Sequence, residues 1–459
     1  MPFDPTLAAI RFGMGLSPII APPVSADDMM ARLRGPDEVA ISVPIPTVDT
    51  VYPSRNDYRE ASRALNAARG TDGEEAAAEF QSQMRADGRN AVATFMKAHV
   101  LRAVVTPDGF RERLTQFWAD HFTVRSVGGI SRHLVSPYIE TAIRPNVAGK
   151  FGDMLVAVVA SPMMIFYLDQ HRSMGPNSQA AQRNNRGLNE NLARELLELH
   201  TLGVDGQYTQ TDVFELAKLL TGVTANAQRG ATFRVQQAEP GRETVLGVEY
   251  GGAEESIDHV KAALQDLAVH PDTARHLAQK LAVHFVAPEP DADMVDAMAQ
   301  AFLAADGDLT ALYDAMLAHE GAWDPALRKV KLPFDFIASS MRALAVPRDV
   351  IENATLQNTR RMVERPLAVM GQSWQDPVGP DGWSENEENW ITPQGMAGRI
   401  TWSMRSPRQL VEDLPDPRDF VFTALGPTPP DAVIFAAGAA ETVRDGVGIV
   451  LASAAFQRR

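Results

Sequence analysis

The chain has 459 residues, a formal net charge of −15 and no cysteine. Without cysteine, disulfides, thiol catalysis, iron–sulfur clusters and cysteine-based zinc sites are excluded. The acidic balance, with lysine and arginine scattered along the chain, makes nucleic acid and anionic membranes poor partners. Hydrophobic residues make up 45% of the chain, which is enough for a sizeable core.

No export or membrane segment is visible in the sequence. The N-terminus, MPFDPTLAAIRFG, lacks the basic start and the long apolar run of a signal peptide. The longest apolar run, Met154–Ala160, is far shorter than a membrane span. We therefore expect neither a signal peptide nor a transmembrane helix.

Helical patterns dominate the first half of the chain. Asn56–Arg69 and Glu74–Arg85 are alanine-rich, and a glycine-containing break separates them. Asn90–Val105 has a stronger helical pattern, and a further helix follows from Phe110 to His121. These patterns predict three separate helices before residue 106 and a fourth that ends in the pair Asp120-His121.

The stretch from Gly187 to Gly222 organises the rest of the chain. It predicts a helix, a tight turn and a second helix. Gly203 is placed to end the first helix in a left-handed conformation. Thr209 and Asp212 match the start signal in which a threonine caps the helix and an acidic residue follows three positions later.

A small β insert follows this stretch. Ala231–Gln236 and Thr244–Tyr250 have strand-like composition and flank Glu239-Pro240-Gly241, which predicts that the two segments pair as a β-hairpin. Helical patterns return from Glu254 to Ala345. A loop rich in glycine, proline and tryptophan then occupies Asp376–Pro393, before the final helices.

The predicted fold is mostly α, a large irregular multi-helix assembly with one small β-hairpin insert. We divide it into an N-terminal helical and loop region, a central helical core with the organising helix, the insert, and a C-terminal helical region packed on the core. The corresponding residues are 1–89, 90–225, 226–253 and 254–459.

The first candidate site lies on the organising helix. Glu190, Arg194 and Glu198 recur every four residues and share one face, with Glu195 beside them. These carboxylates could serve as metal ligands or acid–base groups together with a nearby histidine. The usual di-metal signature, Glu-x-x-His, is absent. We favour the alternative, in which Arg194 bridges the two glutamates and His200 complements the helix dipole.

The second candidate is Asp120-His121. A histidine held by a carboxylate is how bases and metal ligands are oriented. Neighbouring helical residues do not face each other, so Glu195 or Glu198 would have to orient His121. The alternative, which we favour, is a hydrogen-bonded histidine in the core. No cofactor is firmly implied; a divalent metal is the candidate, with His121, Glu198 and His200 as candidate ligands.

Three tryptophans, Trp374, Trp383 and Trp390, lie in and beside the glycine- and proline-rich loop. Aromatic side chains in such a loop could line a groove that binds a sugar or a peptide. They could equally fill a hydrophobic gap, which is the interpretation that we favour.

Several strings of residues resemble the large bacterial family called DUF1800. They include Arg11-Phe12-Gly13, FWADHF at 117–122, NENLARELLELHTLGVDGQYT at 189–209, ELAKLLTG at 215–222, HPDTARHLAQKLAVHF at 270–285 and MGQSW at 370–374. The resemblance spans Arg11 to Trp402. The chain departs from the family where members often have His-Asp before a Gly/Pro turn and this chain has Ala238-Glu239, which removes a candidate metal ligand.

The resemblance implies a domain of unknown function whose members are often encoded beside sulfatase-like proteins of the DUF1501 family. It therefore implies a partner rather than a reaction. One hypothesis is a non-catalytic binding or assembly protein that acts with a DUF1501-like partner. The alternative is a hydrolase, metal-assisted or not, that uses His121 with Glu190, Glu195 and Glu198. The chain would be cytoplasmic, or exported folded with a signal-bearing partner; whether it is an enzyme, and its oligomeric state, stay open.

Overall fold

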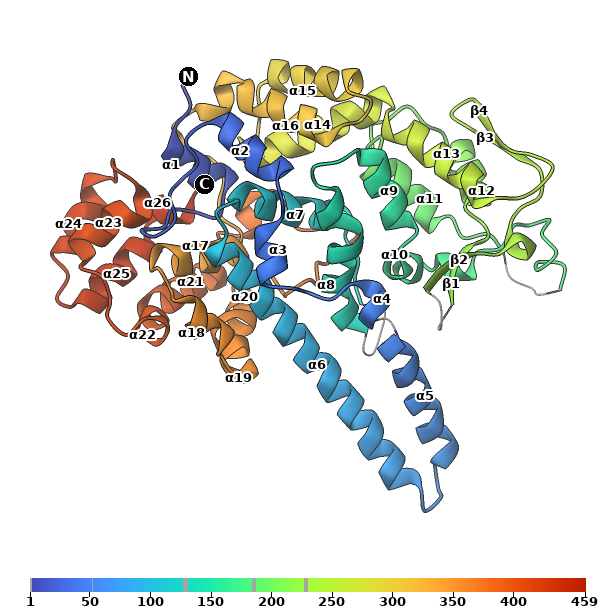
Figure 1. The fold of residues 1–459 in the computed structure, drawn as a ribbon, viewed down its shortest axis with the longest axis horizontal. Coiled ribbons are helices and arrows are strands. Elements are labelled where there is room, and N and C mark those ends of the chain that lie inside the picture. The colour runs from blue at the N-terminus through green and yellow to red at the C-terminus, as the bar shows by residue number, and fades with distance from the viewer. Residues whose placement is uncertain (1, 52, 127–130, 184–186, 227–229) are drawn as a thin grey trace.

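The computed structural model describes residues 2–51, 53–126, 131–183, 187–226 and 230–459. The chain is mostly helical with two small antiparallel sheets, so the predicted fold class is confirmed. A broad helical body carries one long helical hairpin that projects away from it (Figure 1). Among the described residues, no helix combines the length and the apolar character needed to cross a membrane.

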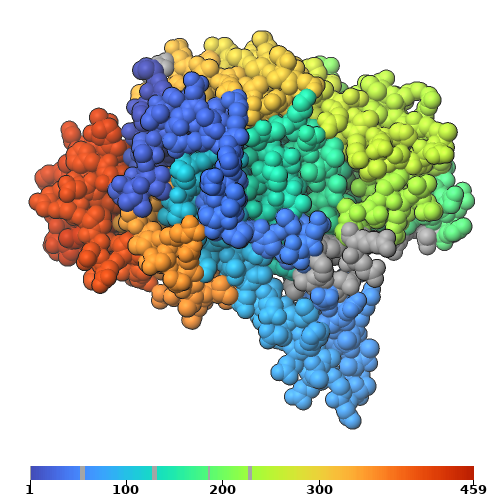
Figure 2. Space-filling model, in the orientation of Figure 1, coloured from blue at the N-terminus to red at the C-terminus, as the bar shows by residue number. Residues whose placement is uncertain are grey.

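The N-terminal segment lies across one face of the body (Figure 2). Arg11, which is fully buried, fixes it by donating hydrogen bonds to the carbonyl oxygens of Ala322 (2.6 Å), Asp324 (2.6 Å) and Ala326 (2.8 Å). The segment contains α1 (Pro5–Leu7), η1 (Ala8–Phe12), α2 (Ala26–Arg34), α3 (Glu38–Ser42) and α4 (Val48–Val51).

The projecting hairpin, here called the arm, pairs α5 (Pro53–Ala68) with the outer half of α6 (Glu74–Val105). The sequence predicts a break within α6, and that prediction is wrong: one helix of 32 residues runs through Gly88. A glycine inside a helix costs only about 1 kcal/mol relative to alanine, which the packing of the inner half can offset. That inner half, from Val92 onward, is largely buried in the body.

The centre of the body contains the organising stretch. Gly203 adopts a left-handed φ of +87° and Thr209 forms a capping box with Asp212, as predicted. The elements are α7 (Gly109–His121), η2 (Ser131–Leu134), α8 (Val135–Tyr138), η3 (Ile139–Ile143), η4 (Arg144–Asn146), α9 (Phe151–Val159), α10 (Pro162–Tyr167), η5 (Gln170–Arg172), α11 (Asn191–Glu195), η6 (Leu196–His200) and α12 (Gln210–Leu219).

The β insert is present, but its strands pair differently from the prediction. In place of one hairpin there are two: β1 (Val223–Asn226) with β2 (Gly230–Phe233), and β3 (Arg242–Val245) with β4 (Val248–Gly251). The turn between β3 and β4 consists of Leu246 and Gly247, both with positive φ, which is the geometry of a tight two-residue hairpin turn. This local turn pairs β3 with its neighbour in sequence. Residues 227–229 of the predicted insert lie outside the described residues.

A layer of helices covers the centre: α13 (Ile257–Ala268), α14 (Pro271–Phe285), α15 (Ala292–Ala304), α16 (Leu309–Ala318) and η8 (Glu320–Trp323). This layer shares one continuous hydrophobic core with α7, α9 and α12. Within this core, Trp118 of α7 is fully buried and donates from Nε1 to the hydroxyl of Tyr313 at 2.6 Å. A buried tryptophan N–H needs such a partner.

The C-terminal helices form a second core with the inner half of α6. They are α17 (Pro333–Ala343), α18 (Arg348–Glu352), α19 (Leu356–Thr359), η9 (Arg360–Glu364), α20 (Arg365–Val369), η10 (Glu387–Asn389), α21 (Pro393–Arg405), α22 (Pro407–Leu410), α23 (Pro417–Leu425), α24 (Asp431–Gly438), α25 (Val443–Ala452) and α26 (Ala454–Gln457). The division of the chain into four segments remains a prediction.

Candidate functional site

Helix α7 forms one wall of the candidate site. Asp108 caps its N-terminus by accepting a hydrogen bond from the backbone N–H of Arg111. The helix is buried along most of its length, so its polar side chains must find partners inside the protein. The side chains of its last two residues have different surroundings. Asp120 lines a cavity, whereas His121 packs against the rings of Phe122 and His200.

The cavity lies between α7, α6, α8, the start of α17 and the loop 372–383. Its central space of about 120 Å³ could hold roughly four water molecules. Aromatic walls come from Tyr138, Phe334, Trp374 and Trp383, and polar groups come from His99, Asp120, His284, Gln372 and Gln375. A half-open cavity with mixed aromatic and polar walls is typical of a small-molecule site.

Two nitrogens in the cavity wall are buried without a hydrogen-bond partner among the described residues. They are Nε2 of His99 and Nε1 of Trp374, whose rings pack together with centroids 5.4 Å apart. Burial lowers the pKa of His99 well below its usual value, so its ring is neutral. A buried polar group without a partner is costly, so a ligand that reached either nitrogen, both of which the wall covers in this structure, would remove that cost.

Asp120 is the acidic group of the cavity. Both of its carboxylate oxygens accept from the backbone N–H of Trp383, at 2.9 and 3.1 Å. Burial raises the pKa of Asp120 to about 7, although the nearby charge of Lys280 opposes the shift. Burial also lowers the pKa of Lys280. Asp120 can therefore exchange a proton near neutral pH, which suits either hydrogen-bond donation to a ligand or general acid–base chemistry.

A second carboxylate, Glu385, anchors the loop beside the cavity. It accepts from Nδ1 of His284 at 2.6 Å and pairs with the ammonium of Lys329 at 2.7 Å. Burial lowers the pKa of His284 to about 4, so its ring is neutral at pH 7 and donates this hydrogen bond. On its other side, Nε2 of His284 lies 3.4 Å from the guanidinium of Arg459. The sequence offers no local signal for this pair, because 101 residues separate the partners.

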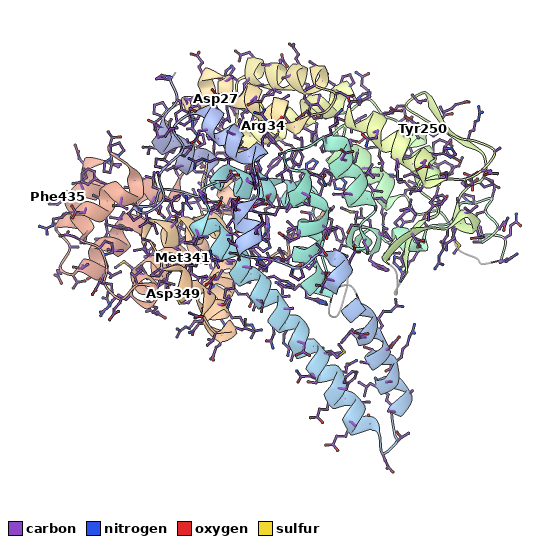
Figure 3. All side chains as sticks on the ribbon, in the orientation of Figure 1. Asp27, Arg34, Tyr250, Met341, Asp349 and Phe435 are labelled. Carbon is purple, nitrogen blue, oxygen red and sulfur yellow. The ribbon has the colours of Figure 1, made fainter. Side chains whose placement is uncertain are left out.

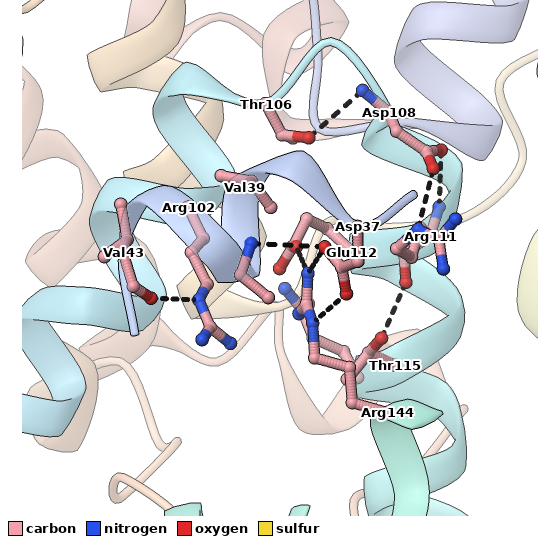
Figure 4. A network of polar contacts seen from close by, with 12 residues as sticks. Asp37, Val39, Val43, Arg102, Thr106, Asp108, Arg111, Glu112, Thr115 and Arg144 are labelled. Atoms are coloured by element: carbon pink, nitrogen blue, oxygen red, sulfur yellow. Dashed lines mark hydrogen bonds and ion pairs between the residues drawn. The ribbon is translucent and has the colours of Figure 1, made fainter. Parts of the chain in front are cut away.

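Asp37, Glu112 and Arg144 belong to a network of polar contacts (Figure 4). Arg144 donates to both oxygens of Asp37, at 2.6 and 2.9 Å, and it also pairs with Glu112, which lines the cavity. Arg113, another lining residue, donates to Asp335 at 2.7 Å. The carboxylates of Glu112 and Asp335 are thus each paired with an arginine. Asp120 is the lining carboxylate that has no cationic hydrogen-bond partner among the described residues.

The predicted carboxylates of the organising helix lie at the surface. Arg194 bridges Glu190 at 3.2 Å and Glu198 at 3.0 Å, as the structural interpretation of this helix proposed. Gln210 extends the network with a hydrogen bond to Glu190. Glu195 is half-buried, and burial raises its pKa, helped by the charges of Glu198 and Asp381.

The predicted histidines are buried instead. His121 Nε2 lies 3.1 Å from the carbonyl oxygen of His200, and neither ring nitrogen of His200 has a hydrogen-bond partner among the described residues. Burial lowers the pKa of His200 to about 3, with the charge of Lys280 contributing. Burial likewise lowers the pKa of His121. Both imidazoles are therefore neutral near pH 7.

The structure does not gather the candidate ligands His121, Glu198 and His200 into one metal site. Among the described residues, ligand atoms of three such side chains come within 4.8 Å of one another only at Asp291, Asp293 and His319. These three lie at the surface beside α15, where acidic groups often gather without an ion. Whether His121, Glu190, Arg194, Glu195 and Glu198 act in catalysis remains a prediction.

The fold and the cavity define a large helical protein with a small, half-open cavity beside α7. The sequence pattern of the family described as "Protein of unknown function (DUF1800)" matches residues 10–458, which is nearly the whole chain. The chain belongs to this family, as the resemblance predicted. No curated protein and no solved structure matches it.

Proposed function

We propose that the protein binds a small neutral polyhydroxylated ligand, a sugar, in the cavity beside α7. The observation that carries this proposal is the pair of unpartnered buried nitrogens, His99 Nε2 and Trp374 Nε1, in a wall that also contains Asp120. Buried polar groups in native proteins are nearly always hydrogen-bonded, so these positions call for a partner that the described residues do not supply.

The chemistry of the walls favours a sugar over a charged ligand. The amide oxygens of Gln372 and Gln375 accept from Phe334 N and Ser136 Oγ, which leaves the amide NH₂ groups to donate. Tryptophan faces suit the C–H faces of a sugar ring, and hydroxyl groups suit a mixture of donors and acceptors. An anionic ligand would meet no unpaired cation among the described lining residues, and Asp120, with a pKa of about 7, offers a cationic ligand only part of a negative charge at neutral pH.

The experiment is a calorimetric titration of the protein with a panel of monosaccharides and disaccharides, with short peptides as the competing class. Trp374→Phe keeps the ring and removes the unpartnered N–H, so it should weaken binding about tenfold, the worth of one buried hydrogen bond. Trp390→Phe is the matched control, because Trp390 Nε1 already donates to Ser384 O and does not line the cavity. Equal losses in both variants, or no sugar bound, would refute the proposal.

A second proposal concerns assembly with the sulfatase-like DUF1501 partner that the resemblance implies. Its support is the arm, which projects from the body (Figure 3) and carries Phe80 with 56% of its surface exposed. A large apolar side chain on a projecting hairpin suits a protein contact. If the partner carries an export signal, this chain would leave the cytoplasm folded in its company.

The test is co-expression and co-purification with a protein of the DUF1501 family. Phe80→Ser should abolish a complex that forms through the arm. Ile19→Ser is the matched control, because Ile19 is 73% exposed but lies in the N-terminal segment. A complex that survives Phe80→Ser would exclude the arm as the contact, and no complex with the wild-type chain would exclude the partner.

The hydrolase hypothesis requires His121 to meet at least two of Glu190, Glu195 and Glu198. Glu190 and Glu198 both pair with Arg194, and Nε2 of His121 is hydrogen-bonded to the carbonyl oxygen of His200. The geometry therefore gives this hypothesis less support than it gives ligand binding in the cavity.

A further inference from the structure

At the base of the arm, a groove of about 580 Å³ separates α5 and α6 from η9 and Arg132. Its charged and aromatic lining consists of Tyr58, Arg85, Arg89, Arg132, Arg360 and Glu364. We call it the arginine groove. It is distinct from the cavity beside α7, which has no lining residue in common with it.

The charge of the arginine groove is opposite to that of the chain. Four arginines face one glutamate, so the groove carries a local excess of positive charge in a protein whose net charge is −15. The one acidic lining residue, Glu364, lies 3.8 Å from Nε of Arg360, at the outer limit of an ion pair. Like charges held together without counter-charges repel, and a bound anion would relieve that repulsion.

Three of the arginines are held in place by hydrogen bonds to neutral acceptors, and of the three only Arg360 also has a carboxylate, Glu364, within ion-pair distance among the described residues. Arg360 donates to the carbonyl oxygen of Arg89 at 3.1 Å, and Arg85 donates from Nε to the hydroxyl of Tyr58 at 2.9 Å. Arg132 donates to the carbonyl oxygen of Trp374 at 2.9 Å. All three acceptors are neutral. The guanidinium groups are therefore pre-positioned, and pre-positioned groups lose little freedom when a ligand binds.

Two further features of these arginines bear on ligand binding. Nε of Arg132 is buried and has no hydrogen-bond partner among the described residues. Arg85 and Arg89 are four residues apart on α6, so both reach the same side of the helix. Guanidinium groups bind the oxygens of phosphate through paired N–H donors, which makes arginine the preferred residue for phosphate recognition.

We propose that the arginine groove binds a small molecule that carries more than one phosphate group. The number of arginines matches a polyphosphate better than a single phosphate, and the space exceeds what one inorganic phosphate needs. The proposal goes beyond sugar binding in the cavity and does not depend on it.

The experiment is a titration of the full chain with tripolyphosphate, and separately with inorganic phosphate, at constant ionic strength. Arg89→Gln and Arg132→Gln should each weaken tripolyphosphate binding at least about tenfold, because each removes a charge-assisted contact. Arg63→Gln is the matched control: Arg63 is exposed on the same arm, carries the same charge and lies outside the groove. The control should bind within about twofold of the wild type, since screened surface charges contribute little.

Each outcome decides the proposal. Arg89 is exposed, so Arg89→Gln should fold even if Arg132→Gln does not, and thermal melting of each variant checks this. No binding of tripolyphosphate at millimolar concentration overturns the proposal. Equal weakening in Arg63→Gln overturns it too, because the attraction would then come from the surface of the arm in general. Binding of inorganic phosphate as tightly as tripolyphosphate would overturn the assignment to a polyphosphate.

Discussion

Arg132 donates from Nη2 to the carbonyl oxygen of Trp374 at 2.9 Å, and this bond joins the two candidate sites. Arg132 lines the arginine groove, whereas Trp374 lines the cavity beside α7. The ring of Trp374 also packs on His99 of α6. The side chain of Arg132, which lies in the groove at the arm, thus holds the backbone of Trp374 in the cavity wall. A ligand that restrains Arg132 would therefore also restrain Trp374.

Arg132→Ala should lower the free energy of unfolding by about 1 to 2 kcal/mol, because it leaves the carbonyl oxygen of a buried residue without its donor. Arg125→Ala is the control. Arg125 donates to the carbonyl oxygen of Val378 and pairs with Asp376 at a more exposed place, so its loss should cost less than about 1 kcal/mol. Urea denaturation followed by circular dichroism measures both. If both variants lost the same free energy of unfolding, the hydrogen bond from Arg132 to Trp374 would stabilise the protein no more than the surface contacts of Arg125 do.

Asp120 should make the stability of the protein depend on pH. Burial raises its pKa to about 7, whereas an aspartate in an unfolded chain has a pKa of about 4. The native state therefore holds the proton more tightly, and the free energy of unfolding should fall as the pH rises from about 4 to about 7.

Asp120→Asn removes this titration and keeps an oxygen for the N–H of Trp383. The stability of the variant relative to the wild type should rise across that pH range by at most about 4 kcal/mol, the full worth of the pKa difference. Urea denaturation at several pH values measures the change. Asp349→Asn, at an exposed position on α18 that Figure 3 labels, is the control and should leave the profile unchanged. A flat difference for Asp120→Asn would show that Asp120 is ionised throughout.

Glu385→Gln should destabilise the protein by about 3 kcal/mol, because it leaves the buried ammonium of Lys329 without its counter-charge. The same change weakens the bond to His284. Glu387→Gln is the control two residues away: its partner Arg458 is 35% exposed, so the cost should stay below about 1 kcal/mol. Thermal and urea denaturation measure both variants. If the two costs were alike, the Glu385 cluster would be no stronger than a surface pair.

Much of the fold could be predicted from the sequence because helical periodicity and capping signals are local. The capping box of Thr209 and Asp212 and the positive φ of Gly203 follow from a few neighbouring residues. The pairing of the β insert was missed because the pattern of two strand-like segments does not say which neighbour each one joins. The tight turn at Leu246 and Gly247, in which both residues have positive φ, pairs β3 with β4.

The candidate site was harder to predict because its groups come from distant parts of the chain. Asp120 and Trp383 are 263 residues apart, and the rings of His99 and Trp374 meet although one lies on α6 and the other in the loop that follows α20. The sequence shows which residue types are present, but it does not show that these residues contact one another in the fold. The surface bridge of Arg194 could be foreseen, since its partners lie four residues away on the same helix.

Glu198→Gln should cost less than about 1 kcal/mol, because it breaks one bridge to a partly exposed Arg194. The same variant tests the metal hypothesis. Since the ligand atoms of Glu198, His121 and His200 do not converge, elemental analysis of protein purified without chelator should give the same metal content for the variant and the wild type. A stoichiometric metal that is lost in Glu198→Gln would instead favour the metal-assisted hydrolase.

Gly203→Ala should be among the most destabilising small substitutions in the organising stretch. The added Cβ would lie 2.7 Å from Nδ1 of His276, and the backbone φ of +87° already disfavours any side chain. Gly247→Ala separates the two effects, because Gly247 has a φ of +78° and nothing within 4 Å of its would-be Cβ. We expect about 1 kcal/mol for Gly247→Ala, from the backbone alone, and about 2 to 3 kcal/mol for Gly203→Ala. Urea denaturation compares them, and equal losses would mean that His276 moves aside freely and does not hold the turn.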